Sequence, residues 1–175
     1  MDRRHDALAA ASEVVLAVET VANRSAQMVA TVGKLEVEPG AANVIPGRAT
    51  FTLDVRHPDD GEREGACKTI LSSASDIASR RRVEVEVQPV SARAAVACSP
   101  RMIALLLEAG GPGVIQLPSG AGHDAVYMSE LTEIGMLFVR CKGGVSHNPA
   151  ESVEAADVAV AIDVLGRFLD LLAKG

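Results

Sequence analysis

The chain has 175 residues, enough for one large domain or two small ones. Apolar residues make up 48% of it, but with three phenylalanines, one tyrosine and no tryptophan the core must be built from aliphatic side chains. The 17 basic and 23 acidic residues give a mildly acidic protein, which argues against a nucleic acid as partner. No apolar run approaches the roughly 20 residues that a membrane helix needs, so no membrane association is predicted.

The first half of the chain predicts alternating helices and strands. Apolar residues recur at helical spacing over 6–23 and again over 61–79. Strands are predicted over 29–37 and over 49–56, where small or apolar residues alternate with polar ones. Strict alternation over 83–87 predicts a third strand. The order α-β-β-α-β predicts an α+β layer with two helices on one face of an antiparallel sheet.

The regular alternation of helix and strand patterns is interrupted within 89–100. We place a domain boundary there, dividing the chain into 1–92 and 93–175. The elements expected after it are a short helix over 101–109, a strand over 114–117, a helix over 125–131, a strand over 134–139 and an amphipathic helix over 155–173. Two short strands make a poor independent sheet. This half is therefore expected to be part of a larger α/β sheet whose other strands are absent.

The cysteines and the N-terminus indicate the compartment. Cys67, Cys98 and Cys141 are odd in number and widely spaced, as expected of free thiols in a reducing environment. The charged stretch 1–6 lacks the apolar core of a signal peptide. A cytoplasmic protein is predicted.

Two histidines lie in glycine-rich breaks that follow short apolar runs. His123 ends Ser-Gly-Ala-Gly-His at 119–123, and His147 lies within Gly-Gly-Val-Ser-His-Asn-Pro-Ala-Glu at 143–151. Glycines let the backbone and one imidazole approach a ligand closely, and neutral imidazole is the commonest protein ligand of transition metals. The pattern suggests a metal-assisted site, although one histidine ligand does not make a metal site.

Four segments together resemble a known family. Asn-Val-Ile-Pro-Gly at 43–47 and Phe-Thr-Leu-Asp-Val-Arg-His at 51–57 resemble the lid, or dimerisation, domain of dinuclear-metal amidohydrolases. That family comprises N-carbamoyl-L-amino-acid hydrolases, allantoate amidohydrolase and β-alanine synthase, with aminoacylase-like carboxypeptidases as distant relatives. Segments 118–125 and 144–151 are similar to its two late catalytic-domain motifs. The resemblance implies a partial, ferredoxin-like lid domain without its first strand, followed by a C-terminal fragment of an α/β catalytic domain.

The resemblance also implies roles for individual residues. His147 matches the last ligand of a two-metal site that holds zinc or manganese, and His123 matches a histidine that stabilises the oxyanion of the tetrahedral intermediate. Asn43 and Arg56 match a pair that binds the substrate carboxylate in the active site of the neighbouring subunit, where the arginine fork suits a carboxylate. The backbone amide of Gly122 is a further candidate donor.

The rest of the family's ligand set is not found in this sequence. The His-x-Asp corner, the glutamate ligand and the glutamate base belong to a segment expected to precede the chain. The implied function is hydrolysis of a C–N amide of an N-carbamoyl amino acid or ureido compound such as allantoate, by metal-activated water in a homodimer. The isolated chain is expected to be inactive and to hold no stoichiometric metal. A non-catalytic dimerising domain is the alternative.

Some residues keep two interpretations. Asp124 is favoured as a helix cap over a ligand. Arg56 would ordinarily be a solvated strand residue, but its spacing from Asn43 favours carboxylate binding. Glu151 either orients a neighbour of the metal site or lies in the first turn of a helix, where a carboxylate complements the helix dipole. His5 and His57 are taken as surface residues.

Overall fold

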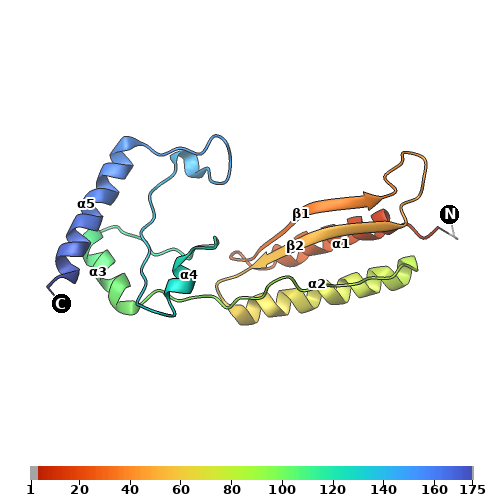
Figure 1. Ribbon diagram of the computed structural model, residues 1–175, viewed down its shortest axis with the longest axis horizontal. Helices are drawn as coiled ribbons and strands as arrows, with labels where there is room; N and C mark the ends of the chain where they lie inside the picture. The colour runs from red at the N-terminus through yellow and green to blue at the C-terminus, as the bar shows by residue number, and fades with distance from the viewer. Residues whose placement is uncertain (1–3, 175) are drawn as a thin grey trace. The chain divides into compact units, whose positions relative to one another are not determined.

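A computed structural model describes residues 4–174 of the chain. In chain order its elements are α1 (Ala7–Ala22), β1 (Val29–Glu38), β2 (Arg48–Arg56), α2 (Asp60–Arg81), α3 (Pro100–Gly110), α4 (Ala125–Met128), the 3-10 turn η1 (Lys142–Gly144) and α5 (Ala155–Leu172) (Figure 1). The chain forms two units. The first takes the residues up to Ala95 together with Pro118–Gly120, and the second takes Val96–Leu117 and the residues from Ala121 onward.

The first unit is built on a hairpin of β1 and β2. The strands pair antiparallel from Val29 opposite Arg56 to Glu38 opposite Arg48, with an irregularity between Val32 and Lys34. Alternate residues of both strands pack on the core, so the period-two pattern of the sequence correctly marks the buried face. Both predicted strands are confirmed, and α1 and α2 lie together on one side of the hairpin (Figure 1).

Helix α1 begins where the Asp6 carboxylate accepts the backbone N–H of Ala9 at 3.0 Å. This side chain supplies an acceptor to one of the first N–H groups of the helix, which have no partner within it. An ion pair with Arg4 compensates the charge of Asp6, which is the one buried charged residue among those described. Both hydrogen bonding to Ala9 and pairing with Arg4 lower the pKa of Asp6 against the opposing effect of burial.

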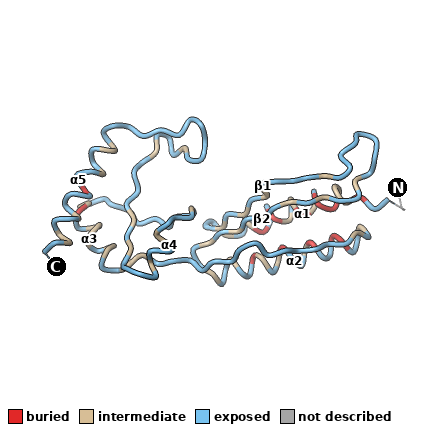
Figure 2. Tube along the Cα trace, in the orientation of Figure 1, coloured by how far each residue is buried: buried red, intermediate tan, exposed pale blue. Residues whose placement is uncertain are grey.

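Helix α2 is capped at both ends. At its start the Asp59 carboxylate accepts the backbone N–H of Glu62 at 2.9 Å, and at its end Arg82 adopts the left-handed conformation with φ 56°. Ile70 of α2 and Val18 of α1 are both 2% exposed and belong to one apolar cluster. Figure 2 shows the buried positions spaced along α1 and α2. The core of this unit is therefore aliphatic, as its composition predicts.

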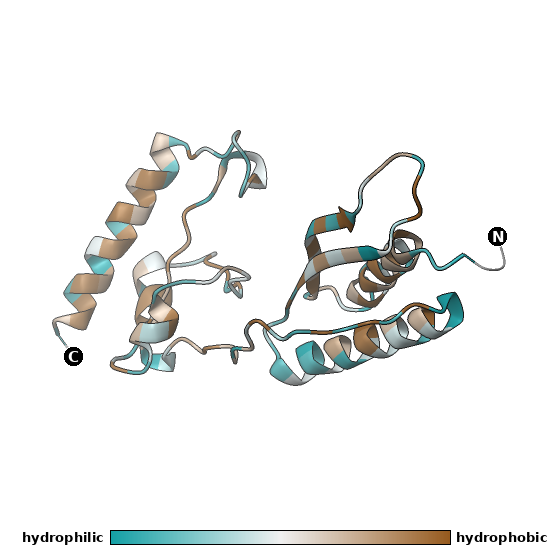
Figure 3. Ribbon diagram, turned by 45° about the vertical axis from the view of Figure 1, so that its right-hand side comes forward, coloured by the Kyte–Doolittle hydropathy of each residue, from teal (hydrophilic) through white to brown (hydrophobic). Residues whose placement is uncertain are grey.

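The strand predicted over 83–87 is wrong. The segment has no ladder with any described strand; Val83 packs on the core, but Val85 and Val87 are exposed. Figures 1 and 3 show it running back beside α2 as coil. Alternating side chains predict an extended backbone, but a strand also needs a hydrogen-bonded neighbour, and none is supplied by the part of the chain that the structure describes.

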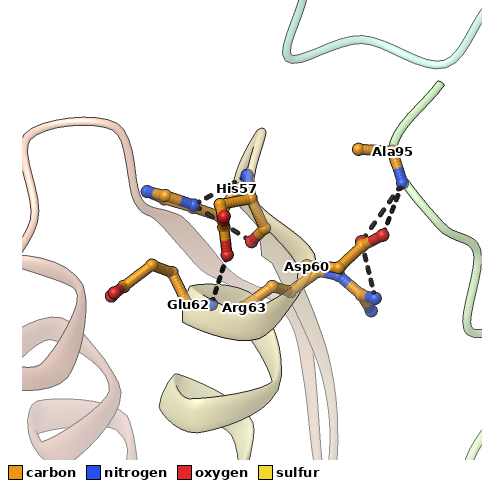
Figure 4. Close-up of polar contacts among 6 residues, drawn as sticks. His57, Asp60, Glu62, Arg63 and Ala95 are labelled. Carbon is orange, nitrogen blue, oxygen red and sulfur yellow. Dashed lines mark hydrogen bonds and ion pairs between the residues drawn. The ribbon is translucent and has the colours of Figure 1, made fainter. Parts of the chain in front are cut away.

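The start of α2 also holds the chain where it leaves the first unit. The Asp60 carboxylate accepts the backbone N–H of Ala95 through both oxygens, at 3.1 and 3.2 Å, and pairs with Arg63 at 2.9 Å (Figure 4). Segment 83–95 is thereby fixed to the first turn of α2, at the end of the helix where β2 enters it.

The second unit is organised around α3 and α5. Ser99 caps α3, whose first residue is Pro100, and the Arg167 guanidinium donates to the carbonyl of Ala109 at 2.7 Å. Segment 134–139 passes so close to α3 that a Cβ on Gly135 would lie 3.0 Å from the Met102 side chain. Figure 3 shows apolar positions recurring along the whole of α5, and several of them, such as Ile162, are exposed.

Helices 101–109 and 155–173 are confirmed within a residue or two, whereas the helix predicted over 125–131 ends at Met128 and continues as turns. The strands predicted over 114–117 and 134–139 are wrong for the same reason as 83–87: within residues 4–174 they have no strand neighbour. The fold class is α+β, with a two-stranded sheet. None of the described helices is both long and apolar enough to cross a membrane.

Candidate functional site

Arg56 lies at the end of β2, and its guanidinium is held by two partners, Asp54 and Gly120. Its Nε and Nη2 donate to the two carboxylate oxygens of Asp54, at 3.0 and 2.5 Å, and Nη1 donates to the carbonyl of Gly120 at 2.8 Å. The ion pair lowers the pKa of Asp54 and raises that of Arg56. Arg56 is thus an oriented, paired cation. Asp54 was not singled out from the sequence, although its i, i+2 spacing places it on the same strand face.

Asn43 lies in the exposed loop that joins β1 to β2, at the opposite end of the hairpin from Arg56. Eight residue steps along β2 separate Arg48 from Arg56, which at about 3.3 Å per residue is roughly 26 Å. A single carboxylate spans only a few ångströms. The structure therefore does not bring Asn43 and Arg56 of one chain together.

Gly122 and His123 are exposed and directly precede α4. The carbonyl of His123 accepts the backbone N–H of Val126 at 3.0 Å, which starts the first turn. Asp124 occupies the N-cap position of α4, as expected, but its side chain makes no capping hydrogen bond.

His147 lies in a loop that is closed at its base. Cys141 and Val153 form an antiparallel bridge, and the backbone N–H of Lys142 donates to the carbonyl of Ser152 at 2.8 Å. The ring Nδ1 of His147 lies 3.0 Å from the Ser146 hydroxyl. The other ring nitrogen, Nε2, has no hydrogen bond among the described residues, and it is the atom available to a metal ion.

Glu151 holds this loop from within. One carboxylate oxygen accepts the backbone N–H of His147 at 2.9 Å, and the other lies 3.7 Å from the Cys141 sulfur. Burial, and next the Glu151 carboxylate, raises the pKa of the Cys141 thiol. Helix α5 begins only at Ala155, so the first-turn interpretation of Glu151 is wrong and the orienting one remains.

A complete metal site is not assembled within residues 4–174, where no three histidine, cysteine, aspartate or glutamate side chains gather in an arrangement that could hold a metal ion. A dinuclear site needs several such donors, including a bridging carboxylate. Among the described residues, His147 is therefore a candidate for one coordination position, and no whole centre is assembled.

Known proteins match this chain almost from end to end. Residues 6–171 match the profile of peptidase family M20/M25/M40. The chain is 38% identical to an N-carbamoyl-L-amino acid amidohydrolase of Geobacillus stearothermophilus, with 100% of this chain and 44% of the relative covered. It is 39% identical to a probable allantoate deiminase of Oryza sativa subsp. japonica, covering 97% of this chain and 41% of the relative.

The chain is also similar to a solved structure of a related enzyme. An amidase of the hydantoinase/carbamoylase family from Burkholderia vietnamiensis superposes with a TM-score of 0.89 at 34% identity, over 96% of this chain and 42% of that one. The chain thus spans less than half the length of the relatives it matches. With the family profile matched over nearly all its residues, the chain belongs to peptidase family M20/M25/M40.

Proposed function

We propose that this chain is part of a metal-dependent amidohydrolase that cleaves a C–N amide in an N-carbamoyl amino acid or in a ureido compound such as allantoate. The observation that carries the proposal is the match, along its whole length, to an N-carbamoyl-L-amino acid amidohydrolase at 38% identity. The family is one of metal-dependent hydrolases in general. We also propose a cytoplasmic location, since the three cysteines are free.

In this proposal residues 1–92 act as a lid and dimerisation domain, and residues 93–175 belong to the catalytic domain. Two helices on one face of a β-hairpin are what supports a lid of ferredoxin-like type. The hairpin ends in Arg56, whose guanidinium keeps Nη1 and Nη2 protons beyond those used by Asp54, so its end can still meet a second carboxylate.

Metal binding is assigned to His147 through Nε2, with zinc or manganese as the ion and the other ligands from the portion of the relatives that this chain does not cover. When bound, such an ion supplies an activated water. His123 is assigned to donate a hydrogen bond to the oxyanion, assisted by the backbone N–H of Gly122. A preorganised donor of this kind contributes about 3 to 4 kcal/mol to lowering the barrier.

Carboxylate recognition is assigned to Asn43 and Arg56 from two different chains. The resemblance implies that both residues reach into the neighbouring subunit's site. The roughly 26 Å along β2 between Arg48, which follows the Asn43 loop, and Arg56 supports taking them from different chains instead. In a two-fold dimer, each site can take Asn43 from one copy and Arg56 from the other. The substrate site then requires the homodimer, which gives the proposed dimerisation a catalytic reason.

Mixed dimers test this assignment. The chain is joined to the part of the Geobacillus enzyme that it does not cover, and hydrolysis of an N-carbamoyl-L-amino acid is measured. Asn43→Ala and Arg56→Ala are each expected to be nearly inactive. When the two variants are co-expressed in equal amounts, half of the dimers should be mixed, and each mixed dimer should have one intact site of its two. About a quarter of full activity is therefore expected to return.

No recovery on mixing would contradict the shared site, because two residues from one chain can never complement in this way. Absence of any carbamoyl hydrolysis by the unsubstituted hybrid, with zinc or manganese bound, would contradict the proposed activity itself. Glu86→Ala serves as the matched control: it removes an exposed charge in the same unit, and full activity is expected.

A further inference from the structure

His147 has a backbone conformation that its place in the chain does not explain. Its φ of 55° lies in the left-handed region, and among the described residues the one other non-glycine with positive φ is Arg82, which terminates α2. His147 terminates no helix. A side-chain-bearing residue remains in this region only when its surroundings hold it there, and such residues gather at functional sites.

The Glu151 carboxylate provides the contact that holds it. The 2.9 Å hydrogen bond from the His147 backbone N–H joins two residues four apart across the loop, and the second carboxylate oxygen faces Cys141 at the base. The intervening chain turns back on itself, since the Glu151 N–H donates to the Asn148 carbonyl at 2.9 Å. The tip of the loop is thus tied to its closed base through one side chain.

Resting on the ligand role given to His147 in the proposed function, we propose that Glu151 is a positioning residue that fixes the backbone of His147 and so aims its Nε2 at the metal. The contact is to the backbone and not to the ring. The Ser146 hydroxyl contacts Nδ1, so backbone and ring are oriented by separate groups. Groups that orient a metal ligand typically contribute a factor of about 10 to 100 to metal affinity.

Hydrogen exchange on the chain itself provides the first test. In Glu151→Ala, the His147 amide is expected to exchange about tenfold faster or more, because it loses its acceptor. Glu151→Gln retains an acceptor oxygen and should keep most of the protection. Glu154→Ala is the matched control: this exposed residue lies just beyond the base of the loop, at the start of α5, and pairs with Lys142. Unchanged exchange in Glu151→Ala, or equal acceleration in Glu154→Ala, would overturn the proposal.

Zinc affinity, measured by competition with a chelator, is the second test, in the hybrid with the Geobacillus enzyme. We expect Glu151→Ala to weaken Zn²⁺ binding about 10- to 100-fold, with Glu151→Gln close to the parent and Glu154→Ala unchanged. If His147→Ala weakens zinc binding and Glu151→Ala does not, the positioning role is overturned while the proposed function stands. If His147→Ala leaves zinc binding intact, the ligand assignment fails and the positioning role fails with it.

Discussion

Replacing Ile70 by alanine tests whether the first unit is held together by the contact of α2 with α1. Ile70 is 2% exposed, and the substitution removes three carbon atoms from the apolar cluster. At about 0.8 kcal/mol per carbon the lost burial is about 2.4 kcal/mol, and the cavity left behind raises the loss to about 3 to 4 kcal/mol. A domain of this size has a free energy of unfolding of roughly 5 to 15 kcal/mol, so the loss is a large part of the total.

Urea unfolding followed by far-ultraviolet circular dichroism measures the effect. With a slope of about 2 kcal/mol per molar, the midpoint should fall by about 1.5 to 2 M. The control is the next residue, since Leu71 is 42% exposed on the outer side of α2 and its change to alanine should lower stability by less than about 1.5 kcal/mol. Equal shifts for the two substitutions would refute the packing of α2 on α1 described above.

Four further predictions concern charge and the proposed site. Because hydrogen bonding to Ala9 and pairing with Arg4 lower the pKa of Asp6, its stabilising effect is complete above the ordinary aspartate pKa and is lost as pH falls through the lower folded value. Acid unfolding should therefore be steeper in the parent than in Asp6→Asn, and parallel acid curves would contradict this. In the active hybrid, Arg56→Lys should raise KM sharply because a lysine cannot form the bidentate fork, and His123→Ala should lower kcat more than it raises KM; steady-state kinetics decides both. Elemental analysis of the purified chain should find less than one equivalent of zinc or manganese, and two equivalents would contradict the single-ligand assignment.

The helices could be predicted because their signals are local. Asp6, Asp59 and Ser99 precede apolar residues at helical spacing, and each caps a helix in the structure. The hairpin could be predicted for the same reason, since its two strands are neighbours in sequence. The alternating segment 83–87 and the apolar segment 134–139 are predicted as strands but form none, because a strand is completed by a partner that the pattern does not specify.

The site was predictable as a set of residues but not as an arrangement. Spacing and resemblance singled out His147 and Arg56, yet neither indicated that Asp54 holds the arginine, that Asn43 lies at the far end of the hairpin, or that Glu151 bonds to a backbone N–H. These are properties of register and loop closure. They depend on which backbone groups meet, and one-letter patterns carry little information about that.

Because Pro118–Gly120 belongs to the first unit, neither unit is one continuous stretch of sequence, and this limits how the units can be exchanged by recombination. The chain passes between the units three times, so a gene cut after Ala95 would not release the first unit whole: Arg56 would lose the Gly120 carbonyl that it contacts. A single recombination event therefore cannot transfer either unit complete. Exchange of the first unit between relatives should therefore succeed only when segment 118–120 is exchanged with it.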